Sequence, residues 1–302
     1  MPLLRNLRFL IEYGLLRAAA AVLRLLPLDA AVRMAGKLCR IIAPRTKLHR
    51  RAEGNIEHAL PDLSASERQR ILLKMWENTG RVVAEMLMLD RVCSDPKRIQ
   101  IVRKAELEQL IRGAGPRIGI TLHLGNWELS GWTCVECGAR LAGIYRPLRN
   151  PYIDRYIYQS RLTYYPGGLL YKGKQPDRTP LGRPASSAVQ LLRAGGHLGF
   201  AADQIDSAAP FSVQFFGQEA KFTVAPALFA RRLDARMIIG RSVRIGEGST
   251  FRFDFCEVPV RTTDQLDDDI RHLTQAMVDQ FEQRSEERRV GKECRSRWSP
   301  YH

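Results

Sequence analysis

Short runs of β-branched and aromatic residues alternate with helical stretches from Arg117 onward, and this alternation limits the possible folds more than any other feature of the chain. It predicts an α/β region over 113–283, with a mixed, largely parallel sheet flanked by helices. The expected strands are IGITL, LAGIYR, HLGFAAD, RMIIGRSVRI and FRFDFCEV, and the expected helices lie near 126–137, 151–163, 184–194, 222–233 and 264–282.

A helical region over 46–112 comes before the sheet. Apolar residues recur at helical spacing in Ser66–Leu89 and Pro96–Ile111, so a helix is expected in each segment. Within the α/β region, Tyr164–Pro184 is rich in Gly, Pro, Lys and Arg, a composition that predicts a mobile basic loop.

The first 45 residues are expected to associate with a membrane. Residues 1–27 are apolar but interrupted by charges, and their longest charge-free run is Ala18–Leu23, which is too short for a clear span. They predict a basic amphipathic helix lying in the bilayer interface, followed by a second helix at Ala30–Ala43. A short tilted span with snorkelling arginines and a helix packed on the domain's own core stay open as alternatives. No clean apolar region precedes a small-residue cleavage site, so a cleaved signal peptide is not expected.

The net charge of +15, with an isoelectric point near 9.9, implies anionic partners such as nucleic acid, an anionic bilayer or acidic substrates. The six cysteines are scattered, which suits a reduced, cytosol-facing protein better than a disulfide scaffold. Cys134 and Cys137 form a CxxC pair, but no second pair or histidine spacing completes a zinc site, so no metal is expected.

The segment 284–302 looks foreign to the rest of the chain. It lacks apolar periodicity and carries six Lys or Arg against three Asp or Glu, so without its net +3 the chain still holds +12. It resembles a vector or adapter read-through, and we expect it to be disordered, or at least packed on nothing. The native C-terminus is then expected to be missing.

TLHLGNWE, residues 121–128, predicts a catalytic centre. His123 and Glu128 stand five residues apart, which on one regular helix would separate their side chains by about 140°. Gly125 and Asn126 tolerate turn conformations, and a bend there lets the two side chains meet. We therefore expect a strand ending near His123, a turn at Gly125-Asn126 and a helix that carries Glu128 in its first turn, at the carboxyl edge of the sheet.

Such a pair suits the activation of a hydroxyl. A neutral imidazole can take the proton of an attacking alcohol, while a carboxylate on the other ring nitrogen fixes the tautomer. The nucleophile would be the substrate's own hydroxyl, so no serine or cysteine nucleophile is needed. A bare H-x4-E pattern is weak evidence without its surroundings.

The surroundings resemble the lipid A biosynthesis acyltransferases, the lauroyl and myristoyl transferases within the H-x4-D/E glycerolipid acyltransferase superfamily. The resemblance covers roughly residues 5–283, so 46–283 is expected to form one acyltransferase domain. Its motifs are TLHLGNWELSG, IYRPLRNPYID, GGHLGFAADQ, FFG with FTVAPALFARRLDA, and the upstream blocks RRAEGNIEHALPDLSASER and WENTGRVVAEML. Past residue 283 the family continues with a proline, a tryptophan and a basic cluster, which this chain replaces.

The resemblance implies roles for individual residues. His123 is the expected base, Glu128 its partner, and Asp203 a further catalytic residue that closes the site. Arg146 is expected at the substrate. Arg149 and Asn126 complete the substrate-binding candidates, although Arg149 and Asn150 are also suited to a turn, and Asp203 to capping a helix.

Four further histidines and one aromatic pair are not expected to take part in catalysis. His197 lies inside an expected strand and is interpreted as structural, while His49, His58 and His272 are interpreted as surface residues. Phe215 and Phe216 could equally line an acyl pocket or pack in the core.

The resemblance implies an O-acyltransferase without a cofactor, at the cytoplasmic face of the inner membrane. The acyl donor would be acyl carrier protein or acyl-CoA, and the acceptor a hydroxyl of a lipid A precursor. The basic excess then has two natural partners, a phosphorylated glycolipid and the acidic carrier protein, besides anionic membrane lipid. An acyltransferase for another lipid, such as a lysophospholipid or a phosphatidylinositol mannoside, is the alternative. No nucleic-acid-binding motif and no GxSxG elbow support a nucleic-acid-binding protein or an α/β hydrolase.

Overall fold

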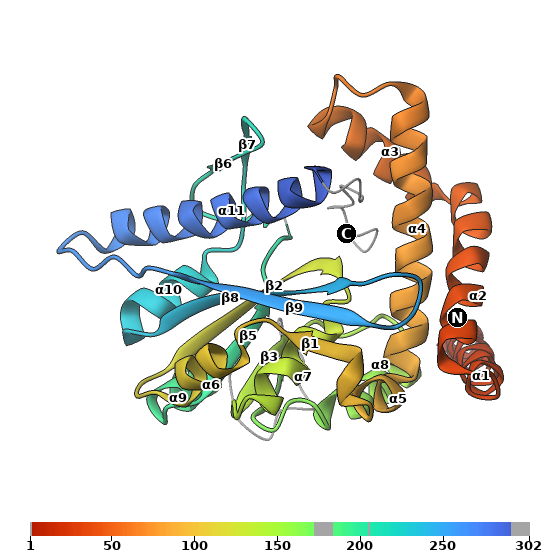
Figure 1. Cartoon of the computed structure of the whole chain (residues 1–302), viewed down its shortest axis with the longest axis horizontal. Coiled ribbons are helices and arrows are strands. Elements are labelled where there is room, and N and C mark those ends of the chain that lie inside the picture. The colour runs from red at the N-terminus through yellow and green to blue at the C-terminus, as the bar shows by residue number, and fades with distance from the viewer. Residues whose placement is uncertain (1, 172–183, 205, 291–302) are drawn as a thin grey trace.

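The computed structural model describes residues 2–171, 184–204 and 206–290. Its α/β region is built on a seven-stranded sheet with the order β1-β9-β8-β2-β5-β3-β4 (Figure 1). The strands from β8 to β4 run parallel, whereas β9 pairs antiparallel with β8 and parallel with β1, so the predicted fold class is confirmed. The strands are β1 (Ile99–Ile101), β2 (Arg117–Gly125), β3 (Leu141–Tyr145), β4 (Gly168–Tyr171), β5 (His197–Ala201), β8 (Arg236–Arg244) and β9 (Phe251–Val258).

The middle strand β2 shows why the sheet is covered on both faces. Its alternate residues Ile118, Ile120, Leu122 and Leu124 are buried on one face. There they pack with α9 (Pro184–Arg193), α10 (Ala225–Leu233) and α11 (Leu266–Val290). The opposite face is covered by α6 (Lys104–Arg112), α7 (Glu128–Glu136) and α8 (Pro151–Leu162).

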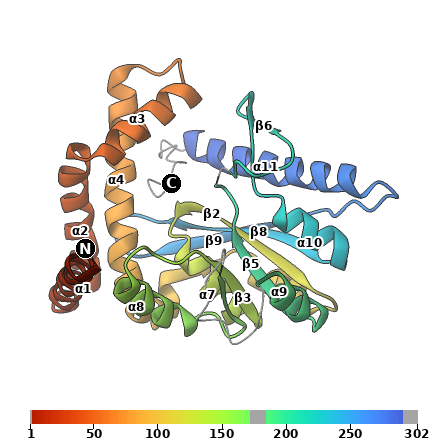
Figure 2. The ribbon, with the colours of Figure 1, turned by 180° about the vertical axis from the view of Figure 1, so that it is seen from behind.

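The N-terminal helices stand at one end of the sheet, and Figure 2 shows α4 between α2 and the strands. They are α1 (Pro2–Arg24), α2 (Leu28–Ile42), α3 (Lys47–Ala59), α4 (Ala65–Leu87) and α5 (Leu89–Cys93). A capping box of Ser64 and Glu67 starts α4. Gly80 lets α2 approach closely, because a Cβ there would lie 2.5 Å from the carbonyl oxygen of Ala35.

Two local predictions were wrong. Pro96–Ile111 is not one helix: residues 96–98 form a 3₁₀ turn, β1 follows, and helix α6 begins only at Lys104 after left-handed Arg103 (φ 53°). Part of the expected loop Tyr164–Pro184 is strand β4, whose Leu169, Leu170 and Tyr171 are buried beside β3. Residues 172–183 of that loop lie outside the described part of the chain. A short hairpin of β6 (Val213–Phe215) and β7 (Gln218–Ala220) turns at the FFG motif.

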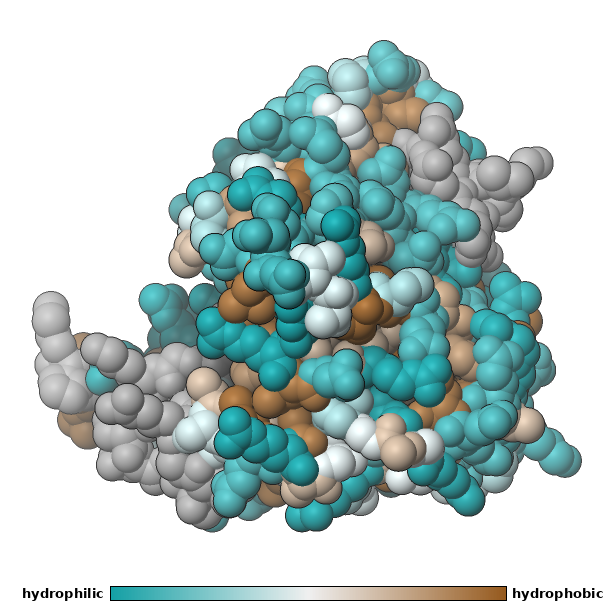
Figure 3. Space-filling model, turned by 90° about the vertical axis from the view of Figure 1, so that its left-hand side faces the viewer, coloured by the Kyte–Doolittle hydropathy of each residue, from teal (hydrophilic) through white to brown (hydrophobic). Residues whose placement is uncertain are grey.

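No helix among the described residues is long and apolar enough to cross a membrane. Helix α1 packs inward through Ala20 and Leu23, yet it leaves Leu3, Leu4 and Leu7 more than half exposed. By contrast, hydrophilic side chains predominate on the face turned away from α1 and α2, where apolar residues occur in small groups (Figure 3). The exposed apolar side of α1 agrees with a helix lying in an interface, which stays a prediction.

The segment predicted to pack on nothing begins with a buried residue. Arg284 lies within α11, is 7% exposed and forms an ion pair with Asp254 on β9. Its carbonyl oxygen accepts a hydrogen bond from Arg241 on β8. The expectation is therefore wrong at Arg284, while residues 291–302 lie outside the described part of the chain.

Candidate active site

The carboxyl end of β2 carries the H-x4-E motif, as the sequence predicted. His123 is the third-last residue of this strand, and α7 begins at Glu128. Gly125 makes the turn with a φ of 63°, and a Cβ there would lie 1.9 Å from the carbonyl oxygen of Ser242 on β8. Only glycine fits that approach, and it lets the backbone N–H of Asn126 donate to the same oxygen at 3.0 Å.

The imidazole of His123 forms its hydrogen bond with Asp203, two residues beyond the end of β5. The Nδ1–Oδ1 distance is 2.8 Å, and Oδ2 of Asp203 also accepts the backbone N–H of His123 at 2.7 Å. Strands β2 and β5 are parallel neighbours paired at Thr121 and Ala201, so their ends bring together residues 80 positions apart. This two-point contact fixes the carboxylate relative to the strand as well as the ring.

The electrostatics of this pair favour an ionised Asp203. Burial by itself would raise the pKa of Asp203, but attraction to His123 and the two hydrogen bonds outweigh it and lower the pKa. Burial would lower the pKa of His123, but the Asp203 carboxylate outweighs it and raises the pKa. Because a carboxylate only accepts, Nδ1 carries the proton in the neutral ring, and Nε2 of that form has a free lone pair.

Glu128 does not bind the imidazole, contrary to the geometric prediction. Its carboxylate is held by the guanidinium of Arg161 on α8, with Nε donating to Oε2 at 2.9 Å and Nη2 donating to Oε1. Trp127 Nε1 also donates to Oε1, at 3.2 Å. The ring of Trp127 in turn lies 5.0 Å from that of His123. Glu128 acts on His123 through its charge, which contributes to the raised pKa of the imidazole.

Arg161 is a residue that sequence reasoning missed. Its guanidinium lies 5.5 Å from the ring centre of Tyr145, and burial would lower its pKa, but attraction to Glu128 outweighs that and raises it. Bidentate arginine–carboxylate pairs are strong and geometrically specific. Arg161 stands 33 residues after Glu128, beyond the end of the IYRPLRNPYID motif, so no local sequence pattern pairs the two.

The predicted substrate-binding residues lie in two different environments. Arg146 and Arg149 are exposed in the loop after β3, which is two strands away from β2 at the same edge of the sheet. Asp154 holds this loop by accepting the backbone N–H of Leu148 at 2.8 Å. Asn126 is fully buried and hydrogen-bonded at both ends of its amide, to Glu85 on α4 and to the backbone of Glu128. Substrate binding by any of the three stays a prediction.

The histidines and the phenylalanine outside the H-x4-E motif make structural contacts. His197 is buried, and its Nε2 lies 3.1 Å from the carbonyl oxygen of Ile111. His49, expected at the surface, accepts a hydrogen bond from Trp76 Nε1 at 3.0 Å. Phe215 packs its ring against Phe222 within the core. Within the described residues, no group of three or more His, Cys, Asp or Glu could hold a metal ion.

The structure is a three-layer α/β fold, and a part-buried imidazole is held by a carboxylate at the end of its central strand. This arrangement is typical of enzymes that activate a hydroxyl or water for attack on a carbonyl. The sequence model of the bacterial lipid A biosynthesis acyltransferases matches residues 2–287, so the chain belongs to that family of enzymes. The match confirms the resemblance and extends it past residue 283. No curated protein sequence matches the chain.

Proposed function

We propose that this acyltransferase moves a fatty acyl chain from a thioester donor to a hydroxyl of a lipid A precursor, with His123 as the general base. The donor is acyl carrier protein or acyl-CoA, and the reaction takes place at the cytoplasmic face of the inner membrane. One observation carries the assignment of the base: the 2.8 Å contact between Nδ1 of His123 and ionised Asp203, which leaves Nε2 to accept a proton.

The chemistry follows from this tautomer. Nε2 removes the proton of the acceptor hydroxyl as its oxygen attacks the thioester carbonyl carbon. The tetrahedral intermediate collapses, the carbon–sulfur bond breaks, and the leaving thiolate takes the proton back from Nε2. Asp203 stabilises the imidazolium between these two steps and never gives up its charge. The products are an ester and a free thiol, and the base is regenerated.

Glu128 and Arg161 support the base from a second side. Their ion pair is nearly buried, with the side chains 5% and 24% exposed. The Glu128 carboxylate raises the pKa of His123 without touching it, and Arg161 partly opposes that effect. We propose that the pair stabilises the positive charge on the imidazolium while fixing the first turn of α7.

Arg146 and Arg149 are proposed to bind the phosphates of the glycolipid acceptor. Both are exposed, and both follow β3 at the edge of the sheet that carries His123. Two strand spacings separate β3 from β2, roughly 10 Å, a distance that one sugar unit can span. The net charge of +15 would also attract an acidic carrier protein.

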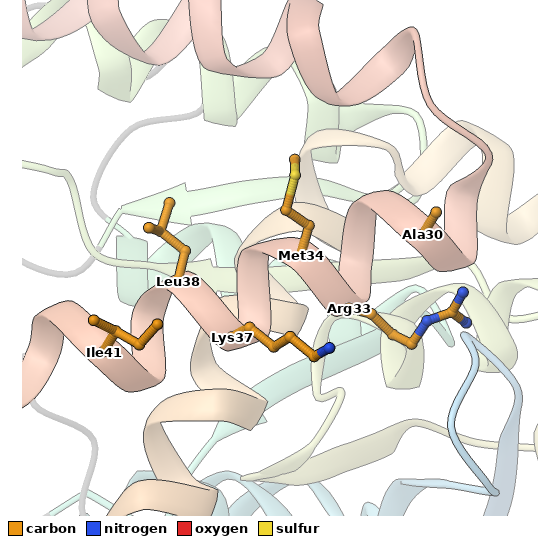
Figure 4. Close-up of a pocket in the computed structure, with 6 residues that line it drawn as sticks. All are labelled: Ala30, Arg33, Met34, Lys37, Leu38 and Ile41. Atoms are coloured by element: carbon orange, nitrogen blue, oxygen red, sulfur yellow. The ribbon is translucent and has the colours of Figure 1, made fainter.

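Helices α1 and α2 are proposed to lie on the anionic surface of the membrane. Figure 4 shows a shallow apolar groove on α2, from which Met34 and Leu38 extend together while Arg33 and Lys37 point from a neighbouring side. Apolar residues beside basic ones suit the boundary between acyl chains and anionic headgroups. Ile41, 58% exposed, extends the apolar side by one turn.

The test measures the acylated product, with wild type and with a variant that lacks the proposed base. Mass spectrometry of lipid A compares cells that lack the gene with cells complemented by wild type or by His123→Ala. We expect one additional acyl chain with wild type and none with His123→Ala at equal protein level. Purified protein is then given lauroyl-CoA or lauroyl carrier protein with a lipid A precursor. Unchanged lipid A, or activity of His123→Ala above about a tenth of wild type, overturns the proposal.

A further inference from the structure

The turn between β2 and α7 is held by helix α4 as well as by the sheet. Nδ2 of Asn78 donates to the carbonyl oxygen of Gly125 at 3.0 Å, and Nδ2 of Asn126 donates to Oε2 of Glu85 at 2.8 Å. Asn78 and Glu85 are seven residues apart, close to two helical turns, so they project from the same face of α4. This helix therefore fastens the turn at two neighbouring points.

Glu85 is built into a buried network. Its side chain is 0% exposed, and its oxygens accept from Nη1 and Nη2 of Arg244 at 2.5 and 2.8 Å. The hydroxyl of Ser249 donates to Oε1 at 2.7 Å. A buried carboxylate needs such a charged partner and full hydrogen bonding. The two-point ion pair with Arg244 thus keeps Glu85 in one place, where a further hydrogen bond goes to Asn126.

This arrangement fixes which way the Asn126 amide faces. A carboxylate can only accept, so the end of the amide turned toward Glu85 must be the NH2 group. The amide oxygen then faces the other way, where it accepts the backbone N–H of Glu128 at 3.2 Å. The side chain of Asn126 is 0% exposed, so its whole amide is used inside the protein.

We infer that Glu85 is a positioning residue for acyl transfer, acting through the Asn126 amide on the turn that joins His123 to Glu128. The inference rests on the proposed role of His123 and gives Asn126 a positioning role in place of contact with substrate. A misplacement of about 1 Å at a reacting group can cost roughly 100-fold in rate, so a turn held from α4 and β8 at once serves catalysis directly.

Asn126→Asp tests the inference with the smallest possible change. It replaces the NH2 group by oxygen, so that two carboxylates face each other where the hydrogen bond was. We expect kcat to fall about 10- to 100-fold with the KM for the thioester donor within about twofold, because the turn shifts while the donor site stays. In Asn126→Asp/Glu85→Gln the amide and carboxylate exchange places, so a donor again faces an acceptor at the turn, but Nη2 of Arg244 loses its acceptor Oε2. This double variant should therefore recover part, not all, of the kcat lost in Asn126→Asp.

Ser249→Ala is the matched control, because it removes another buried hydrogen bond from the same carboxylate but does not reach the turn. Its melting temperature should drop as in the Asn126 variants, while kcat stays within about twofold. If Asn126→Asp folds poorly, Asn126→Ala replaces it and must lose more kcat than Ser249→Ala. Equal kcat losses at Asn126 and Ser249 overturn the inference.

His123→Ala in the same series separates this inference from the proposed function. Full activity of His123→Ala rejects the proposed base. An inactive His123→Ala beside a fully active Asn126→Asp rejects only the positioning role of Glu85.

Discussion

Oδ1 of Asp203 lies 2.8 Å from Nδ1 of His123, and the other oxygen of the same carboxylate accepts the backbone N–H of His123. One carboxylate therefore sets the tautomer of the ring and the position of the strand that carries it. Asp203 follows β5, the strand next to β2, so the pair exists only once the two strands have paired.

Asp203→Asn should reduce acyl transfer by about 10²- to 10⁴-fold while the fold survives. The asparagine NH2 group would donate to Nδ1, which moves the ring proton to Nε2 and leaves no lone pair for the acceptor hydroxyl. In the wild type the Asp203 charge raises the pKa of His123 against the effect of burial. In Asp203→Asn that charge is gone, so the pKa of His123 should fall. Since the base works only when unprotonated, the acidic limb of the residual pH–rate profile should move to lower pH. A limb that stays or moves upward contradicts this account.

Removing one charge of the Glu128–Arg161 pair should destabilise the protein more than removing both. Arg161→Met leaves a carboxylate that is 5% exposed without its counter-ion, and should cost about 3–5 kcal/mol in the free energy of unfolding. Glu128→Gln/Arg161→Met removes both charges and should lose less than half as much. Urea denaturation measures all three proteins, and equal losses in the single and double variants would mean that packing, not charge, accounts for the effect.

The two exposed arginines after β3 should differ in their effect. Arg146→Ala should impair transfer to the phosphorylated acceptor, mainly through a raised acceptor KM, whereas Arg149→Ala should be milder. One charge out of the chain's large basic excess changes long-range attraction little, so a large loss at Arg146 signals a specific contact. Steady-state kinetics with the acceptor varied at fixed donor decide the point. Small and equal losses in the two variants would mean that Arg146 is a solvated surface residue without a specific contact to the acceptor.

Local patterns in the sequence predict most of the sheet but not its edges. The strands β2, β3, β5, β8 and β9 stand out as β-branched or aromatic runs, so all five were predicted. Strands β1 and β4 have three and four residues and are stabilised by pairing with β9 and β3. A strand that short has no periodicity of its own to recognise, which is why Ile99–Ile101 was assigned to a helix and Gly168–Tyr171 to a loop.

The candidate site was predictable only where its residues are close together in the sequence. The motif placed His123, Gly125 and Glu128 correctly on a strand, a turn and a helix, because all three lie within six consecutive residues. Which carboxylate binds the ring depends on β5 lying beside β2, and which cation binds Glu128 depends on α8 folding back to it. Arg161 and Glu85 become part of the site only through these long-range contacts, for which a single sequence has no signal.

The exposed apolar side of α1 should be required for membrane binding. Leu4, Leu7 and Ile11 lie three and four residues apart on one side of the helix and are 72%, 54% and 56% exposed. Leu4→Gln/Leu7→Gln/Ile11→Gln should reduce binding to vesicles with anionic lipid at least about tenfold, because the apolar area that enters the interface is lost. Vesicle sedimentation measures the bound fraction.

A matched control uses exposed apolar residues outside α1 and α2. Leu48, Val102 and Leu162 are 39%, 37% and 38% exposed, and replacing all three by Gln should leave vesicle binding within about twofold. Equal losses in the two triple variants would mean that general hydrophobicity, not the side of α1, controls binding. Activity on detergent-dispersed substrate should stay near wild type in both variants, because none of the six residues belongs to the candidate active site.

The ion pair at the end of α11 should contribute to stability although it falls in the segment that looked foreign. Arg284 is 9% exposed at its side chain and pairs with Asp254, which Arg241 also binds at 3.0 Å. Arg284→Met keeps the apolar stem and removes the charged hydrogen bonds, so it should cost about 1–3 kcal/mol in the free energy of unfolding. The size of that loss decides whether Arg284 belongs to the folded domain.

An exposed ion pair on the same two strands provides the comparison. Arg236 and Glu257 join β8 to β9 at 2.5 Å, but their side chains are 47% and 37% exposed, so solvent screens the attraction. Arg236→Met should therefore change the free energy of unfolding by less than about 1 kcal/mol. Equilibrium denaturation of the wild type and both variants, at low and at high salt, separates the two cases. The loss of stability caused by Arg236→Met should shrink strongly with salt, because salt screens the exposed pair, whereas the loss caused by Arg284→Met should not. If Arg284→Met proves as mild as Arg236→Met, the residue is dispensable and the folded domain ends before it, where the sequence first suggested.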